Sequence, residues 1–313
     1  EIYTLSLHDA LPIWSAGIST MDKRKSLIAS VFLALVALSW GSSYSIVKDS
    51  LSVLEPFTLM AFRFTTSGLL LSLIYAKKLL KITRKEVKQG TIIGIFLFSA
   101  FAALAIGVSH TSASKASFLI GSYVLTVPFF AWFINKKRPD RFDIIGAVCA
   151  TTGLGLLTLG SITGLNKGDI ICVICSLAFA FHMIMIEKFC HDADSIRLTI
   201  VQFWFAAVCF VFLSLFTENH DLTPIVSIKY SLAYLIIAST VIAFVVQNVA
   251  QKYISSTATA LILTLESVFG SIFALFYLNE TMTLTMATGC ATVFVGILIQ
   301  QIKPGKKKKE EKT

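Results

Sequence analysis

Apolar runs of about 20 residues recur ten times along the chain, and only short polar loops separate them. A helix of that length crosses the hydrocarbon core of a bilayer. Lipid offers no partner to backbone N–H and C=O groups, which favours helices over open strands. The alternating ten-residue segments of a membrane β-barrel do not occur in the sequence. We therefore predict an all-α polytopic membrane bundle with ten spans, at about 26–47, 56–76, 90–110, 114–134, 142–160, 168–188, 196–216, 230–250, 256–278 and 283–301.

The composition agrees with a membrane protein. Hydrophobic residues make up 55% of the chain and charged residues 14%, whereas a soluble domain has about 25% charged residues. The fifth and tenth predicted spans are the least strongly apolar, because both are rich in Gly and Thr. The six cysteines lie mostly within apolar runs, so we interpret them as small core residues and not as a disulfide framework.

The basic residues predict how the chain is oriented. If the N-terminus is cytoplasmic, cytoplasmic segments contain 22 of the 27 Lys and Arg residues. External loops then contain Lys48, Lys167 and Lys229, and only Arg63 and Lys115 lie within spans. This is the positive-inside pattern, and it predicts a multi-pass plasma-membrane protein with both termini cytoplasmic. The net charge of +9 needs no nucleic-acid partner, because topology and the lipid bilayer explain it.

We divide the chain into four segments. Residues 1–20 are expected to be a non-native leader, because residues 3–13 resemble a translated sequencing adapter and Met21 is a plausible start. Residues 26–160 and 168–301 contain five predicted spans each. Residues 303–313 form a basic tail that we expect in the cytoplasm, near anionic lipid or simply in solvent.

The two five-span segments resemble each other at an offset of 143 residues. Gly146 and Gly153 in the fifth span correspond to Gly289 and Gly296 in the tenth, and glycines seven residues apart lie on one helix face, where they permit close helix contact. An odd number of spans inverts the second segment relative to the first. Inverted repeats typically enclose a site near the midplane and permit alternating access. A duplicated scaffold is the alternative.

Several motifs resemble those of the drug/metabolite transporter superfamily, EamA type. They are WGSSYSIVK at 40–48, EPF at 55–57, RF at 63–64, HTSAS at 110–114, LESVF at 265–269 and LNE at 278–280. The chain departs from the family pattern at Ser267, where proline is usual, and at Lys137, the first-half equivalent of Glu280. The resemblance covers about 25–302. It implies ten helices, two EamA repeats, and export or import of amino acids or related metabolites.

Four polar residues within the spans are candidates for transport chemistry. A charge at the centre of a spanning helix costs roughly 2.5–3.5 kcal/mol on insertion scales, so Glu266 is a hypothetical proton-coupling or substrate-ammonium site, or else a protonated group between helices. Arg63 could clamp a substrate carboxylate, pair with helix-end carbonyls or extend to the interface. Gln202 lies at a similar depth, where a 139-residue offset aligns the halves. His182 is a hypothetical proton carrier, unless it is only hydrogen-bonded.

Other candidates for substrate contact are aromatic, hydroxyl and amide side chains. Trp40, Ser43 and Tyr44 lie in the outer part of the first span, where they could line a cavity or belong to an interfacial aromatic belt. Gln247 and Asn248 are adjacent amides within the eighth span. They are candidates for substrate binding, with hydrogen bonding between helices as the alternative.

We therefore expect a secondary transporter that exports small metabolites such as amino acids, with a small-molecule substrate and a proton as partners. Multidrug efflux of lipophilic cations is the main alternative, and a non-transporting scaffold or an intramembrane enzyme is a weaker one. The sequence has no Walker-type phosphate loop, and Cys172 with Cys175 lack a second pair at zinc spacing. We expect no enzyme activity, no cofactor and no metal. A homodimer is left open.

Overall fold

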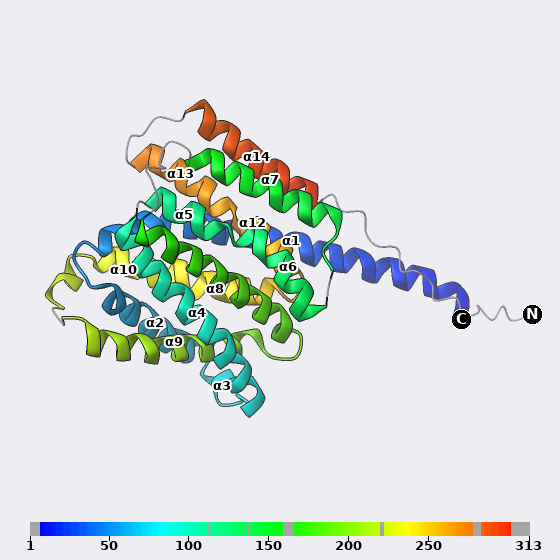
Figure 1. The fold of residues 1–313 in the computed structure, drawn as a ribbon. Coiled ribbons are helices and arrows are strands. Elements are labelled where there is room, and N and C mark those ends of the chain that lie inside the picture. Colours follow the sequence, from blue (N-terminus) through cyan, green and yellow to red (C-terminus); the bar gives the residue numbers. More distant parts are fainter. Residues whose placement is uncertain are drawn as a thin grey trace, which may run out of the picture.

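The chain folds into a bundle of helices in the computed structural model (Figure 1). The structure describes residues 7–111, 113–136, 138–158, 166–219, 222–277 and 283–301. Ser112, Lys137, residues 278–280 and the basic tail lie outside the described residues. The elements are α1 (Leu7–Ser50), α2 (Pro56–Ile74), α3 (Ala76–Leu79), α4 (Arg84–His110), α5 (Ala113–Gly121), α6 (Tyr123–Asn135), α7 (Arg141–Thr158), α8 (Lys167–Cys190), α9 (Ser195–Thr217), η2 (Thr223–Val226), α10 (Lys229–Ile236), η3 (Ile237–Ile242), α11 (Ala243–Ala250), α12 (Ser256–Leu263), α13 (Leu265–Tyr277) and α14 (Leu284–Gln301).

All ten predicted spans are helical in the described residues, which contain no strand. Eight segments are long and apolar enough to cross a membrane. They are Arg24–Ser50, Pro56–Ile74, Arg84–His110, Ala116–Asn135, Lys167–Cys190, Ser195–Thr217, Lys229–Ala250 and Ser256–Phe273. The fifth and tenth spans correspond to the shorter helices α7 and α14, the two that the sequence marks as least strongly apolar.

Three spans are not continuous α-helices. Single residues, Ser122 and Thr264, separate α5 from α6 and α12 from α13. Their ψ angles of −8° and −16° depart from the helical value of about −42°. The eighth span consists of α10, the π-helical segment η3 and α11. A π-helical turn inserts an extra residue and disturbs the regular backbone hydrogen bonds. These irregularities lie within the bundle, where neighbouring helices can supply partners.

The glycines of α7 and α14 confirm the inverted repeat. A Cβ atom at Gly153 would lie 2.6 Å from the carbonyl oxygen of Gly289, and one at Gly146 would lie 2.9 Å from that of Gly296. The contacts thus run in opposite directions along the two helices. Because α7 and α14 are equivalent helices of the two halves, their antiparallel packing means that the second half is inverted. We call α1–α7 the first repeat and α8–α14 the second repeat.

Helices α2 and α9, the second spans of the two repeats, also pack against each other. Gly68 on α2 lies against the Trp204 ring on α9. The helices α1 and α13 cross closely at Gly41, where a Cβ atom would lie 2.8 Å from the backbone nitrogen of Gly270. These close approaches place α1 and α2 of the first repeat directly against α13 and α9 of the second.

The spanning part of α1 begins, and α14 ends, on the same side of the bundle (Figure 1). We call this side, where α2, α6, α8 and α11 also end, the basic face, because Lys77, Lys78, Lys136, Arg138 and Lys252 lie at or near those helix ends. The other side is called the opposite face. The first span thus begins, and the last span ends, on the same side of the bundle, which agrees with the even number of spans predicted from the sequence.

Candidate substrate pocket between the two repeats

A small pocket lies between the two repeats. Most of its lining comes from the first repeat, and α8 and α13 of the second repeat complete it. The lining residues are Trp40, Ser43, Tyr44, Val47, Arg63, Phe101, Leu104, Ile120, Tyr123, Phe179 and Glu266. The structure thus brings five of the sequence-predicted residues together: Trp40, Ser43, Tyr44, Arg63 and Glu266.

Glu266 lies at the start of α13, directly after the interruption at Thr264. Its side chain is buried, and the hydroxyl groups of Tyr123 and Tyr44 donate hydrogen bonds to its Oε1 atom, over 3.2 Å and 3.4 Å. Both bonds end on Oε1, so Oε2 has no protein donor among the residues that the structure describes. Two tyrosines therefore hold the carboxyl group through Oε1, and Oε2 remains available to a ligand in the pocket.

Arg63 is held by the π-helical segment η3. Its Nε donates to the hydroxyl of Thr240 over 2.6 Å, and its Nη2 donates to the carbonyl and hydroxyl oxygens of Ser239 over 3.2 Å and 3.1 Å. The guanidinium carbon lies 4.8 Å from the centroid of the Phe101 ring, a distance at which a cation is attracted by the ring face. Arg63 is 2% exposed, so it does not extend to the membrane interface.

The Ser239 carbonyl also accepts a hydrogen bond from Nε1 of Trp40, over 2.9 Å. One carbonyl of η3 thus fixes two pocket residues, one from α1 and one from α2. This role of η3 could not be predicted from the sequence, because Ser239 and Thr240 are two small polar residues within an apolar run. The Nη1 atom of Arg63 has no protein partner in the described part of the chain, so one face of the guanidinium is available to a ligand.

The remaining predicted residues do not line this pocket. Nε2 of His182 lies 2.8 Å from Oε1 of Gln202, so Gln202 contacts His182 and not the surroundings of Arg63. The amide nitrogen of Asn248 donates to the Phe244 carbonyl over 2.7 Å, and that of Gln247 donates to Gln251 over 3.4 Å. His182 and Gln202 therefore contact each other between α8 and α9, and the side chains of Gln247 and Asn248 bond within or just after α11.

Sequence analysis missed Tyr123, Phe101 and Phe179, which line the pocket. The aromatic rings pack together, with centroids 5.5 Å apart for Phe101 and Phe179 and 6.3 Å apart for Trp40 and Phe179. A signal for Tyr123 was present in the repeat, because the 143-residue offset pairs it with Glu266. The rings make most of the lining apolar around a few polar groups, as in small-molecule sites generally.

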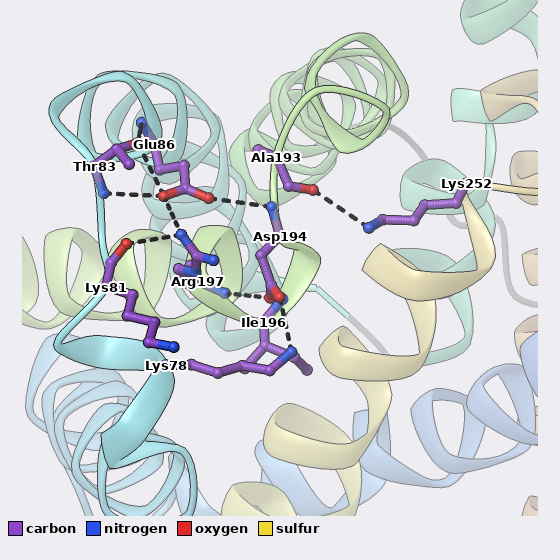
Figure 2. A network of polar contacts seen from close by, with 9 residues as sticks. All are labelled: Lys78, Lys81, Thr83, Glu86, Ala193, Asp194, Ile196, Arg197 and Lys252. Carbon is purple, nitrogen blue, oxygen red and sulfur yellow. Dashed lines mark hydrogen bonds and ion pairs between the residues drawn. The ribbon is translucent and has the colours of Figure 1, made fainter.

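A polar network at the basic face joins the repeats (Figure 2). Lys78 of the first repeat pairs with Asp194 of the second over 2.8 Å, and Arg197 of the second pairs with Glu86 of the first, also over 2.8 Å. Burial raises the pKa of Asp194, but hydrogen bonds from Lys78 and from backbone N–H groups outweigh it and leave the pKa below its ordinary value. Lys252 donates to the Ala193 carbonyl at the edge of this network.

A second connection joins α2 and α9 at the opposite face. The carboxylate of Glu218, after α9, accepts hydrogen bonds of 2.7 Å from the backbone N–H groups of Phe57 and Thr58 at the start of α2. A carboxylate at a helix N-terminus satisfies free N–H groups and complements the helix dipole. Polar contacts therefore hold α9 against the first repeat at both of its ends.

The cysteines and acidic residues form no metal-binding group within the described ranges. Cys172 and Cys175 are buried and unpaired, and the thiol of Cys175 points to the Ala100 carbonyl at 3.1 Å. The chemistry of the pocket is thus that of a guanidinium group, a carboxyl group, hydroxyls and aromatic rings, an arrangement suited to binding.

Comparisons with known proteins agree with this architecture. The model of the EamA-like transporter family matches residues 27–159 and 166–300. An uncharacterized transporter of Archaeoglobus fulgidus is 29% identical over 281 residues, covering 89% of this chain and 87% of that protein. The uncharacterized transporter YyaM of Bacillus subtilis is 23% identical and covers 86% of this chain and 92% of that protein.

A chloroplastic WAT1-related protein of Arabidopsis thaliana is 25% identical and covers 94% of this chain and 72% of that protein. A protein of known crystal structure has the same fold, with a TM-score of 0.71 and 17% identity over 88% of this chain and 96% of that chain. The two family matches together cover most of the chain. The chain therefore belongs to the EamA-like transporter family of the drug/metabolite transporter superfamily and is a multi-pass membrane protein.

Proposed function

We propose that this transporter moves small zwitterionic metabolites such as amino acids, as a secondary exporter that alternates access between its inverted repeats. The observation on which the proposal depends is that Arg63 and Glu266 border one pocket. A zwitterion needs a cationic and an anionic partner at once. Arg63 offers Nη1 to a carboxylate, and Glu266 offers Oε2 to an ammonium group, while the aromatic rings contact an apolar side chain.

The proposed orientation places the basic face in the cytoplasm of a plasma-membrane protein, with both termini on that side. The lysines and arginines at the helix ends of this face support it, because short loops rich in these residues remain in the cytoplasm. Transport then proceeds without ATP hydrolysis or a cofactor. Glu266 is the proposed coupling residue, because it is a buried carboxyl group that borders the pocket.

Efflux of lipophilic cations is the second candidate, and the aromatic lining around Glu266 favours it. A cation can be held by one carboxylate and by the faces of aromatic rings, which Trp40, Tyr44, Tyr123 and Phe179 supply. The buried Arg63 in the same pocket opposes this candidate, because it repels a cation.

A counterflow screen in proteoliposomes tests both candidates. Vesicles are loaded with unlabelled amino acids, nucleosides or a cationic dye, and uptake of the labelled compound is measured. Amino-acid counterflow without dye counterflow is the expected result. Dye counterflow alone would replace the proposal by the second candidate, and flux of no compound class would contradict both.

A further inference from the structure

Four of the buried polar atoms of the second repeat that lack a hydrogen-bond partner in the described part of the chain lie on α8, α9 and α11. They are Nδ1 of His182, Nε2 of Gln202, Oε1 of Gln247 and Oδ1 of Asn248. Each of the four residues is 0% exposed. Buried polar groups almost always have partners, and an unpartnered one calls for an explanation such as an unseen water or ion. We call these four residues the amide–histidine cluster.

The cluster lies where α8, α9 and α11 meet, in the half of the second repeat nearer the basic face. His182 on α8 contacts Gln202 on α9. The Asn248 carbonyl on α11 accepts from the Ser195 hydroxyl, at the first residue of α9, over 3.1 Å. Gln247 reaches α8 through Gln251, whose side-chain amide donates to the Met183 carbonyl over 2.8 Å.

Two contacts show how the repeats correspond in their first two spans. The family match begins at residue 27 in the first repeat and at 166 in the second, 139 residues later. At this offset Lys48 corresponds to Glu187. Lys48 donates to the carbonyls of Val108, in the last turn of α4, and Thr111, directly after it. Glu187 accepts from the backbone N–H and hydroxyl of Ser256, at the start of α12. Both residues thus hold the turn between the third and fourth spans of a repeat.

Residues of the cluster are equivalent, in the second repeat, to residues that line the pocket in the first repeat. At the 139-residue offset Ser43 corresponds to His182 and Arg63 to Gln202, and at the 143-residue offset Leu104 corresponds to Gln247. All three first-repeat residues line the pocket. The amide–histidine cluster therefore lies at the positions of the second repeat that are equivalent to the pocket wall of the first repeat. It is nearer the basic face than the pocket is.

We infer that His182, Gln202, Gln247 and Asn248 form a second polar subsite, which receives the carboxylate or amide end of the transported molecule when the second repeat opens toward the basic face. The inference rests on the proposed function. The subsite offers neutral donors and acceptors in place of the Arg63 guanidinium. Hydrogen bonds to neutral groups are weaker than those to charged ones, so the same group is held less tightly there than at Arg63.

The network at the basic face, which Figure 2 shows, is adjacent in sequence to Ser195, which contacts this subsite. Asp194 and Arg197 flank Ser195, which contacts Asn248, and they pair with Lys78 and Glu86 of the first repeat. Access from the basic face therefore requires separation of the two repeats at this network.

Thiol labelling tests the subsite independently of flux. Asn248→Cys is prepared with Val249→Cys as the matched control, because Val249 is the neighbouring residue and is 39% exposed on the outer surface of the bundle. A charged, membrane-impermeant methanethiosulfonate is added to the basic-face side of vesicles, and the unsubstituted chain gives the background from its own cysteines. We expect Asn248→Cys to react above background and Val249→Cys not to react. Gln247→Cys replaces Asn248→Cys if that variant does not elute as a single species in detergent.

Labelling is repeated with a mixture of the proteinogenic amino acids, and with sorbitol as a control solute. We expect the amino acids to slow labelling at position 248 several-fold and sorbitol to leave it unchanged. No labelling above background, or labelling that amino acids do not slow although counterflow of amino acids is measured, would overturn the subsite. Absence of amino-acid counterflow would instead refute the proposed function, which separates the two failures.

Discussion

Tyr123 and Glu266 occupy equivalent positions of the two inverted repeats, 143 residues apart, and the Tyr123 hydroxyl donates a hydrogen bond to Glu266 over 3.2 Å. Each residue follows the interruption of its span, at Ser122 and at Thr264. An inverted pair brings equivalent positions together near its pseudo-symmetry axis. The repeats therefore meet at a tyrosine and a carboxyl group, and the asymmetry of this pair gives the pocket its single acidic group.

Glu266→Gln is expected to abolish coupling to a proton gradient and leave counterflow measurable. Glutamine can still accept hydrogen bonds from Tyr44 and Tyr123, but it cannot take up or release a proton. The measurement is amino-acid uptake into proteoliposomes with and without an imposed pH gradient. Glu55→Gln is the control, because Glu55 is exposed at the start of α2 and outside the pocket. Uptake by Glu266→Gln that still follows the pH gradient would exclude Glu266 as the coupling residue.

Arg63→Gln is expected to raise the KM for amino acids by more than about tenfold, since loss of one partner of a buried charged pair costs about 2–5 kcal/mol and tenfold corresponds to about 1.4 kcal/mol. Glutamine can bond to Thr240 or Ser239 but supplies no charge to a carboxylate. Concentration-dependent counterflow gives the KM. Arg84→Gln is the control, because Arg84 is exposed at the start of α4 and outside the pocket, and its KM should stay unchanged. An unchanged KM for Arg63→Gln would show that Arg63 is only structural.

The spans could be predicted from the sequence, because the hydropathy of a run averages over about 20 residues. The inversion could be predicted because one glycine spacing recurs in both halves, at Gly146 and Gly153 and at Gly289 and Gly296. The irregularities within the spans could not. The π-helical segment around Ser239 and the interruption at Thr264 change the backbone path without changing the hydropathy of the run. Those irregularities determine which side chains meet in the pocket.

The candidate site was predictable only in part for the same reason. Arg63 and Glu266 are conspicuous because charge is rare at membrane depth, and both line the pocket. Tyr123 alone does not differ from other tyrosines of apolar helices. Only its equivalence to Glu266 in the second repeat indicates a place in the site. The sequence predicts a proton carrier at His182 and a substrate contact at Gln202. It does not predict that they contact each other, because this depends on the rotation of α8 relative to α9.

Gly153→Ala is expected to lower the thermal stability of the bundle. The new Cβ atom would lie 2.6 Å from the Gly289 carbonyl oxygen and 2.8 Å from the backbone nitrogen of Val293, so α7 and α14 must separate, and overpacking of this kind costs about 1–3 kcal/mol. Gly155→Ala is the matched control on α7, because its nearest neighbour, an atom of Phe118, is 4.0 Å away. Melting in detergent, followed by size-exclusion of the soluble fraction, gives both midpoints. Equal midpoints for the two variants would contradict the close helix contact.

Asp194→Asn is expected to destabilise the protein at neutral pH by about 1 kcal/mol or less, the range for partly exposed ion pairs. Asparagine still caps α9, so the variant removes mainly the pair with Lys78. Because the folded-state pKa of Asp194 lies below its ordinary value, the charged form stabilises the fold above the unfolded pKa of about 3.9, and this contribution is lost as the pH falls through the folded pKa. The midpoint difference between the unsubstituted chain and Asp194→Asn should therefore be constant from about pH 7 to pH 5, shrink as the pH falls below about 4, and disappear below the folded-state pKa. Asp192→Asn is the control, because the pair of Asp192 with Lys85 is largely exposed, and it should melt like the unsubstituted chain at every pH. A pH-independent difference for Asp194→Asn would show that the charge of Asp194 is not what stabilises the network.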